Sequence, residues 1–225
     1  MPPFPRKVSD STVRRCSLYL RTLEAMEEEG ATTVSSRVLA QRVGTTAAQV
    51  RKDLSLFGTF GTRGLGYEVR SLRERLREIL GLAQEWPIAL IGAGRIGSAL
   101  FEYPNLRRRG FEIVTILDRD PRKIGRSWDG VRIRSIDEVG EVIERLRIKV
   151  ALVAVPASEA QGVVDRLVGC GIRGILNLAP ARLRVPDGVT VNEVDLALEL
   201  EVISYALGAR GAVPGEIRQD VTSDP

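Results

Sequence analysis

Residues 88–97 read Ile88-Ala-Leu-Ile-Gly-Ala-Gly-Arg-Ile-Gly97, and this stretch decides the fold of the carboxyl-terminal part of the chain. Its four apolar residues predict a short buried strand, and the G-x-G-x-x-G pattern after them predicts a turn that opens a helix over Ser98–Tyr103. The first two glycines permit a tight turn and a close approach of backbone to a pyrophosphate, and the third lets the helix pack on the strand. The pattern predicts a dinucleotide site that includes Gly92, Ala93, Gly94, Arg95, Ile96 and Gly97.

A second strand is expected over Glu112–Leu117, and it ends in Asp118. Asp118 follows Gly97 by about 20 residues, where a carboxylate accepts hydrogen bonds from the ribose of adenosine. A carboxylate there repels a 2′-phosphate, so NAD is favoured over NADP. Arg119, Arg122 and Lys123 follow closely and weaken this preference, and Lys123 is included among the expected cofactor contacts.

Strands and helices continue to alternate further along the chain, with strands expected over Lys149–Val155 and Gly174–Leu178 and a helix over Ser158–Gly169 between them. This alternation predicts an α/β domain over residues 85–191, a Rossmann-type parallel sheet with helices on both faces. Ligands bind outside the carboxyl ends of such strands. The expected nucleotide contacts there are Val155, Pro156, Asn177, Ala179 and Pro180.

The amino-terminal residues 1–84 predict a different, basic module. Residues 1–80 contain 14 Lys and Arg against 9 Asp and Glu, a balance that suits a polyanion partner. A first helix begins at Ser9, Asp10 or Ser11 and ends at Gly30; its apolar positions are Val13, Cys16, Tyr19, Leu20, Leu23 and Met26.

Two short helices follow, and Gly44 lies in the turn between them. The first is capped between Thr33 and Ser36 and carries Val38, Leu39 and Val43; the second begins after Thr46. A small residue, Ala40, precedes the turn, and an aliphatic anchor, Val50, follows it, a spacing typical of a helix-turn-helix. The alternative interpretation is a generic three-helix module with a flexible loop.

Polar and basic side chains on the second of these helices suit base edges and phosphates. The glycine-rich stretch Phe57–Tyr67 predicts a hairpin wing whose tip carries an arginine that can reach a minor groove. The expected DNA-binding residues are Ser36, Gln49, Arg51, Lys52, Ser55, Arg63 and Tyr67.

A last helix is expected to begin at Asn192 or Asp195 and to reach about Leu207. Apolar residues cover more than one of its faces, so we expect burial on several sides, most simply against a partner subunit. Packing on its own sheet edge is the alternative. We therefore assign residues 192–207 as a dimerisation helix, and we expect the tail 208–225 to be disordered.

Composition limits the remaining possibilities. The chain has no His and only two Cys, Cys16 and Cys170, outside any C-x-x-C spacing, so no metal site is expected. No apolar run is long enough for a membrane span, and the first residues lack a signal sequence. We expect a cytoplasmic protein that binds no membrane.

These motifs together resemble the Rex family of redox-sensing transcriptional repressors. The resemblance rests on Ala48–Ser55, Phe57–Tyr67, the glycine pattern at 92–97, Asp118–Gly125, Ala154–Pro156, Gly174–Pro180 and Val194–Asp195. The chain departs from the family at Leu178, Leu196 and Glu193, where a Phe, an aromatic residue and an Asn are usual.

The resemblance implies a homodimer that binds operator DNA when NAD⁺ dominates and leaves it when NADH rises, NADH being the effector and NAD⁺ its competitor. It also implies that the last helix is swapped between subunits. By resemblance, Arg21, Tyr103, Asp195 and Leu196 couple the domains and subunits.

Two other functions remain open from the residues. An NAD-dependent oxidoreductase needs a group that moves a proton; the chain offers no His, only four Lys and no Tyr-x-x-x-Lys, which disfavours an enzyme. A DNA-binding regulator that responds to CoA or another nucleotide is the second alternative, and Asp118 argues against it.

Overall fold

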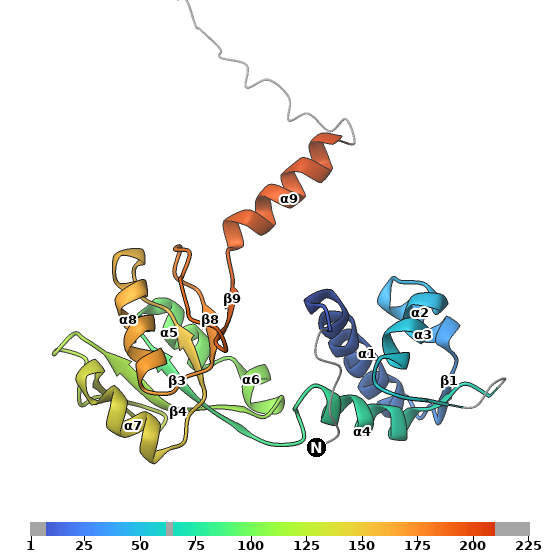
Figure 1. Ribbon diagram of the computed structural model, residues 1–225, viewed down its shortest axis with the longest axis horizontal. Coiled ribbons are helices and arrows are strands. Elements are labelled where there is room, and N and C mark those ends of the chain that lie inside the picture. The colour runs from blue at the N-terminus through green and yellow to red at the C-terminus, as the bar shows by residue number, and fades with distance from the viewer. Residues whose placement is uncertain (1–7, 62–64, 210–225) are drawn as a thin grey trace, which may run out of the picture. The chain divides into compact units, whose positions relative to one another are not determined.

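The computed structural model describes residues 8–61 and 65–209, which divide into two compact units between Glu85 and Trp86 (Figure 1). We call the residues up to Glu85 the first unit and those from Trp86 onward the second unit. This division lies next to the boundary expected between residues 84 and 85.

The described residues of the first unit form the helices α1 (Asp10–Glu28), α2 (Ser36–Val43), α3 (Ala47–Ser55) and α4 (Val69–Ile79). The side chains of Ser9, Ser35 and Thr46 cap the first three of them by accepting backbone N–H bonds. Gly44 ends α2 in the left-handed conformation, with φ of 76°. The local sequence thus sets both ends of the turn between α2 and α3.

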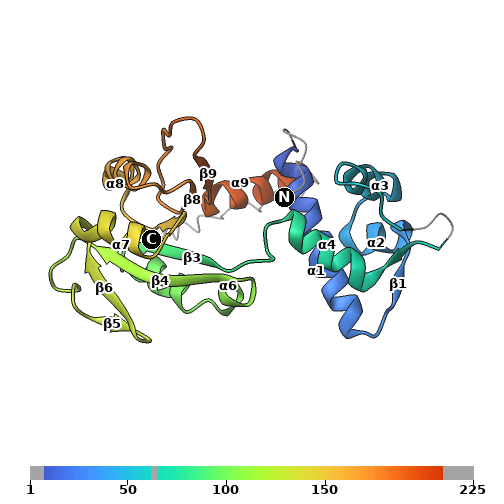
Figure 2. The same cartoon turned by 60° about the horizontal axis from the view of Figure 1, so that its bottom comes forward.

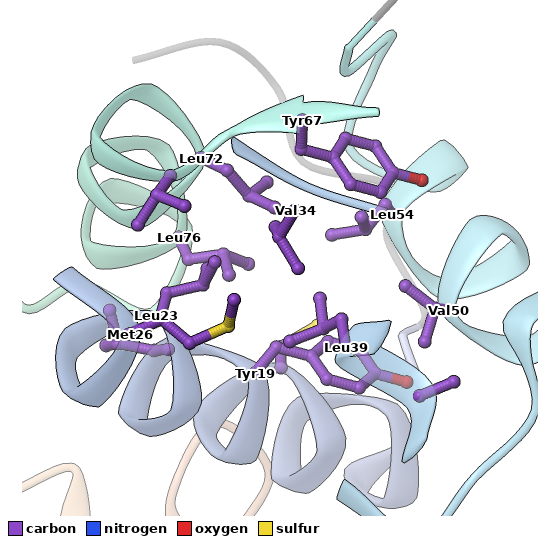
Figure 3. Packing of buried hydrophobic residues seen from close by; sticks show 14 residues of the cluster. Tyr19, Leu23, Met26, Val34, Leu39, Val50, Leu54, Tyr67, Leu72 and Leu76 are labelled. Carbon is purple, nitrogen blue, oxygen red and sulfur yellow. The ribbon is translucent and has the colours of Figure 1, made fainter. Parts of the chain in front are cut away.

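One hydrophobic core holds these helices together (Figure 3). Tyr19 and Leu23 of α1 lie in it, and Ala40 and Val50 are buried on α2 and α3, as the helix-turn-helix spacing predicts. Val13 and Val38 are 42% and 41% exposed, so their assignment to buried faces is wrong. On α1, Thr12 is buried next to Val13, because the buried stripe passes through Thr12, Cys16 and Tyr19.

Among its described residues the first unit also has the strands β1 (Thr33–Val34) and β2 (Tyr67–Glu68), which pair antiparallel. Residues 57–61 form no strand, so the described part of the predicted wing is a loop on its amino-terminal side. Glycine is required at position 66, directly before β2: φ is 85°, and a Cβ there would lie 2.5 Å from the carbonyl oxygen of Val34.

A seven-stranded sheet forms the centre of the second unit. Its order is β5 (Ser127–Trp128), β6 (Val131–Ser135), β4 (Phe111–Asp118), β3 (Trp86–Ile91), β7 (Val150–Val153), β8 (Gly174–Asn177) and β9 (Thr190–Glu193). All neighbouring pairs are parallel except β5 and β6. This is the expected Rossmann-type arrangement.

Helices cover both faces of this sheet, as can be followed in Figures 1 and 2. One face packs on α5 (Arg95–Phe101) and α6 (Pro104–Arg108) through Ile88 and Leu90 of β3. The other packs on α7 (Val139–Arg145), which follows the 3₁₀ turn Ile136–Glu138, and on α8 (Ala157–Gly169), through Ala89 and Ile91. Alternate residues of one buried strand therefore serve two cores.

The last helix, α9, spans Leu196–Ala209. Asn192 lies in β9, so a helix start at 192 is wrong; the Asp195 carboxylate instead accepts from the backbone N–H groups of Ala197 and Leu198 at 2.9 and 3.3 Å. The α9 side chains from Leu196 to Gly208 are exposed, so the expected burial is not met within this chain. The predicted disordered tail lies outside the described residues, apart from Gly208 and Ala209, which are helical. None of the described helices combines the length and apolarity needed to cross a membrane.

Candidate functional site

Two glycines of the turn after β3 leave no room for a side chain. Gly92 has φ of 102°, and a Cβ there would lie 2.3 Å from the carbonyl oxygen of Ala154. A Cβ on Gly97 would lie 2.0 Å from the Gly92 carbonyl oxygen, so α5 approaches the turn as closely as the pattern predicts. At Gly94 the space is open within 4 Å, which leaves its backbone accessible to a ligand.

A cavity of about 630 Å³ opens beside this turn, at the carboxyl ends of β3, β4 and β7. Its volume is in the range of small-molecule and cofactor sites. The lining residues are Ile91, Gly92, Gly94, Leu117, Asp118, Arg119, Asp120, Lys123, Ile136, Ala154, Val155, Pro156, Ser158, Glu159, Gly162, Val163 and Arg166.

Asp118 is the buried charge of this cavity, with 8% of the residue exposed. One carboxylate oxygen accepts from the Ala93 N–H at 2.8 Å and from Lys123 Nζ at 3.0 Å, and the other accepts from the Asp120 N–H at 2.8 Å. Burial raises the pKa of Asp118, but these three bonds outweigh it and hold the pKa below its usual range. The carboxylate is therefore ionised at neutral pH.

Apolar side chains and an ion pair complete the cavity. Ile136, on the turn after β6, and Val163, on α8, both line the cavity, and both pack against the core cluster on the same face of the sheet. Arg119 and Glu159, both at the rim, form an ion pair of 2.8 Å. The cavity can therefore contact a flat apolar group through its aliphatic side chains and hydroxyl groups through its charged side chains.

The predicted nucleotide contacts divide between the cavity and its surroundings. Gly92, Gly94, Asp118, Lys123, Val155 and Pro156 line the cavity. Ala93 and Arg95 line an adjoining hollow that shares Gly94 and Lys123 with it. Gly97 is buried and Ile96 is exposed; Asn177, Ala179 and Pro180 do not line the cavity. The Asn177 amide bonds to the backbone of Ala179 and Ala181, so it shapes its own turn.

Sequence reasoning missed the far wall of the cavity. Ile136, Glu159, Val163 and Arg166 were not expected there, although three of them lie on the helix predicted over Ser158–Gly169. Their spacing on that helix, with Gly162 among them, is the signal that places them on one face. No such spacing marks Ile136. It directly follows β6, a strand that contains two arginines and was not predicted from the sequence.

The helix-turn-helix presents the expected polar face in part. Lys52 and Ser55 are exposed on α3, and exposed Arg51 donates to the Ser36 hydroxyl on α2 at 3.0 Å. Tyr67 is only 8% exposed and lies in the core with Val34 and Leu54 (Figure 3), so its prediction as a surface contact is wrong; it anchors β2 instead. Arg63 lies outside the described residues.

A buried network that the sequence did not reveal joins α1 to α3. Asp53 is 1% exposed and accepts from Arg15 Nε and Nη2 at 2.6 and 2.8 Å and from the Tyr19 hydroxyl at 2.8 Å. The Gln49 amide donates to the same carboxylate at 2.8 Å. The network fixes the orientation of α3 on α1.

The residues expected to couple the two domains lie at exposed places in their own units. Arg21 is on the surface of α1, beside Leu18 and Thr22. Tyr103 precedes α6 and is 50% exposed, and its hydroxyl accepts from Asn105. Asp195 caps α9, and Leu196 is 73% exposed. Their role stays a prediction. Among residues 8–61 and 65–209, no three Asp, Glu or Cys side chains group in a way that could hold a metal ion.

Two family models match the chain. One, described as a putative DNA-binding protein N-terminus, matches residues 7–55, and the other, described as a CoA binding domain, matches residues 83–181. The matches fall on the first and second units respectively.

Curated relatives extend over most of the chain. Proteins of Carboxydothermus hydrogenoformans and of a Roseiflexus species, both named redox-sensing transcriptional repressor Rex, are 47% and 46% identical over 88% of this chain and over 96% and 90% of their own. A Streptomyces coelicolor protein of the same name is 41% identical over 89% of this chain and 78% of its own.

Solved structures of a Rex-family repressor also match the chain. The Rex-family repressor RSP in complex with β-NAD⁺ and operator DNA matches with a TM-score of 0.87 at 36% identity, over 92% of this chain and 95% of that one. RSP in complex with β-NADH matches with a TM-score of 0.83 at 35% identity, over 92% and 97%. The chain therefore belongs to the Rex family of redox-sensing transcriptional repressors.

Proposed function

We propose that this protein is a homodimeric repressor that binds operator DNA through its first unit and is released when NADH occupies the second. The observation that carries the proposal is the ionised, buried Asp118 in a cofactor-sized cavity beside the glycine turn, in the same chain as a helix-turn-helix. The relatives named as repressors and the complexes of RSP with NAD⁺, NADH and DNA support it.

In the second unit, the pyrophosphate lies against the open backbone at Gly94, and the adenosine extends into the cavity past Asp118. A carboxylate offers about four lone-pair positions, of which three are used, so Asp118 retains one for a ribose hydroxyl. Lys123 Nζ has donors beyond the one given to Asp118 and serves the same ribose. Ile136 and Val163 would offer apolar contacts to the adenine.

In the first unit, α3 enters the major groove. Lys52 is exposed and its ammonium group has no bonded partner among the described residues, which suits a phosphate or a base. Arg51 and Ser36 act as one bonded pair at the groove edge. Gln49, Ser55 and Arg63 complete the proposed contacts.

The exposed apolar surface of α9 is covered by a second copy of the chain. Leu196, Leu200 and Tyr205 are 73%, 63% and 79% exposed, and other large apolar residues of the helix are more than half exposed. Such a surface in contact with water marks an interface. We extend this to a helix exchanged between subunits, with residues 1–84, 85–191 and 192–207 as the DNA-binding, nucleotide-binding and dimerisation parts.

The protein acts as a regulator and not as an enzyme. The cavity carries no His, and each of its charged side chains is in an ion pair: Asp118 with Lys123, Arg119 with Glu159, Asp120 with Arg122 and Arg166 with Asp137. The cavity thus lacks the imidazole that most often moves the proton accompanying hydride transfer.

Calorimetric titration of the full chain with NADH, NAD⁺, NADPH and CoA tests the proposal. We expect NADH to bind, NAD⁺ to compete with it, and NADH to lower the affinity for duplex DNA selected in NAD⁺. Binding of CoA in preference to NADH would favour the regulator suggested by the second family model. Hydride transfer to a panel of small carbonyl compounds would favour an oxidoreductase.

A further inference from the structure

Gln49 is the third residue of α3 and is half-buried. Its backbone N–H is capped by the Thr46 hydroxyl at 3.1 Å, and its amide nitrogen Nε2 donates to Asp53 Oδ1 at 2.8 Å. The two side chains are one helical turn apart, so the bond lies along one face of α3.

Chemistry fixes which end of the Gln49 amide faces Asp53. The carboxylate already accepts two bonds from Arg15 and one from Tyr19, and an ionised carboxylate accepts hydrogen bonds only. Turning the amide over would place its oxygen against Asp53 Oδ1, where two acceptors repel each other. The amino end must therefore face the protein.

The opposite end, Oε1, is consequently the atom that points away from Asp53. No described residue donates to it, and it is absent from the buried polar atoms that lack a partner. Oε1 is thus a solvent-accessible acceptor in the first turn of α3, where recognition helices contact base edges.

We propose that Gln49 reads operator DNA as a hydrogen-bond acceptor, through Oε1, and thereby selects an exocyclic amino group in the major groove, adenine N6 or cytosine N4. Guanine and thymine present the acceptors O6 and O4 in the groove, which Oε1 repels. Gln49 Nε2 keeps a second N–H beyond the one given to Asp53. A glutamine that donates this proton to N7 as well binds adenine through both ends, and replacement of N7 distinguishes that contact from the one proposed. The inference rests on the proposed function, in which α3 is the recognition helix.

Arg15 and Asp53 are then positioning residues for this contact. Arg15 is on α1, and its bidentate pair with Asp53 holds the carboxylate to which Gln49 is bonded. The preorganised amide meets a base without first losing rotamer freedom, which favours discrimination between bases.

Base analogues in a duplex test the proposal. The full chain first selects its highest-affinity duplex from a random pool in the presence of NAD⁺. In that duplex each adenine is replaced in turn by purine, which lacks the amino group, or by 7-deazaadenine, which lacks N7, and each cytosine by 2-pyrimidinone, which lacks the amino group. Affinities are measured for the wild type, for Gln49→Met, and for Gln41→Met, the same change at an exposed position of α2.

At one position in each half-site, we expect loss of the amino group to weaken wild-type binding roughly five- to tenfold, the effect of one hydrogen bond. Gln49→Met should abolish that effect, Gln41→Met should retain it, and 7-deazaadenine at the same position should have none. A Gln49-dependent effect of both N7 and the amino group would overturn the acceptor-only orientation, and so would the absence of any Gln49-dependent amino effect. If Arg51→Ala and Lys52→Ala also leave DNA affinity intact, α3 is not the recognition helix and the proposed function fails with it.

Discussion

At the scale of single residues, Asp53 and Asp118 are both nearly inaccessible to solvent, and each is held by one cation and further donors. A buried charge destabilises the folded state unless it is paired and hydrogen-bonded. Removing the partners of either carboxylate should therefore lower the stability of the fold. The carboxylate of Asp53 accepts its hydrogen bonds from Arg15, Tyr19 and Gln49, whereas Asp118 lines a cavity. The first is therefore expected to act on stability, and the second on ligand choice.

Asp53→Asn should destabilise the first unit by about 1–3 kcal/mol at neutral pH, because Arg15 and Tyr19 lose an ionised acceptor. Burial raises the pKa of Asp53, but the hydrogen bonds from Arg15, Tyr19 and Gln49 lower it by more. The pKa therefore lies below its usual range. Because the folded pKa lies below the unfolded one, the carboxylate's stabilisation is present above about pH 4 and is lost as the pH falls through the folded value. Hydrogen exchange of α1 and α3 amides at several pH values measures this. A stability difference between variant and wild type that is constant from pH 7 to pH 3 would contradict the linkage.

Asp118→Ala should weaken NADH binding by about 1–3 kcal/mol, because ribose hydroxyls lose an acceptor. The same change frees Lys123 from its ion pair and places it near a 2′-phosphate, so discrimination against NADPH should relax. Calorimetry with both nucleotides measures the two effects. Asp165→Ala, an exposed carboxylate on α8 outside the cavity, is the matched control. Equal affinities in the wild type and in Asp118→Ala, for both nucleotides, would remove Asp118 from the site.

At the scale of elements, α3 and α9 present opposite kinds of surface. On α3, basic and polar groups face solvent while Val50 and Leu54 are buried. On α9, the solvent-facing groups are mostly apolar. The first surface suits a charged polymer, whereas the second suits another protein surface.

Arg51→Ala and Lys52→Ala should each weaken operator binding and, where the lost contact is a phosphate, reduce the slope of log K against log salt by about one unit. Binding across a salt series measures this slope. NADH affinity should be retained in both variants, since α3 belongs to the first unit. An unchanged slope with reduced affinity would indicate base contacts in place of phosphate contacts.

Leu200→Asp in α9 should dissociate the dimer, because a charge cannot be buried unpaired in an apolar interface. Sedimentation velocity at micromolar concentration measures the mass. Glu201→Gln, a polar change at the next position of the same helix, should leave the dimer intact. A Leu200→Asp variant that keeps the wild-type mass would show that α9 is not the interface.

The elements that could be predicted are those whose buried residues form a pattern. The strands β3, β4, β7 and β8 are apolar runs followed by turn residues. The two helices of the helix-turn-helix, α2 and α3, each follow a residue that caps them. The strand β6 alternates apolar residues with Arg132 and Arg134 near a sheet edge, and α7 is too short for helical periodicity to show. Missing them concealed Ile136 in the cavity wall. Tyr67 was misassigned because an aromatic beside glycines has the same local pattern in a wing and in a core.

At the scale of the whole molecule, one chain joins a DNA-binding unit to a nucleotide-binding unit. Residues 1–80 carry a charge balance of +5 and residues 81–225 one of −1, which sum to the net +4, so the second part is close to neutral. The basic charge therefore lies in the unit that binds DNA, a polyanion. It speeds association with DNA, but it does not make DNA binding depend on NADH. Control requires that NADH bind one conformation of the repressor more tightly than another.

Arg21 and Asp195 are the residues through which we expect this control to run, Arg21 on α1 and Asp195 at the start of α9. If they pair in only one state of the dimer, a contribution of about 1.4 kcal/mol shifts the equilibrium tenfold. Arg21→Ala and Asp195→Asn should therefore leave NADH binding measurable but change how far NADH lowers operator affinity. Operator binding with and without saturating NADH gives this ratio for each variant. The double variant should resemble either single one, because two residues that act as a pair are lost together. Strictly additive changes in the ratio would assign the two residues to independent contacts, and an unchanged ratio in all three variants would place the coupling elsewhere in the dimer.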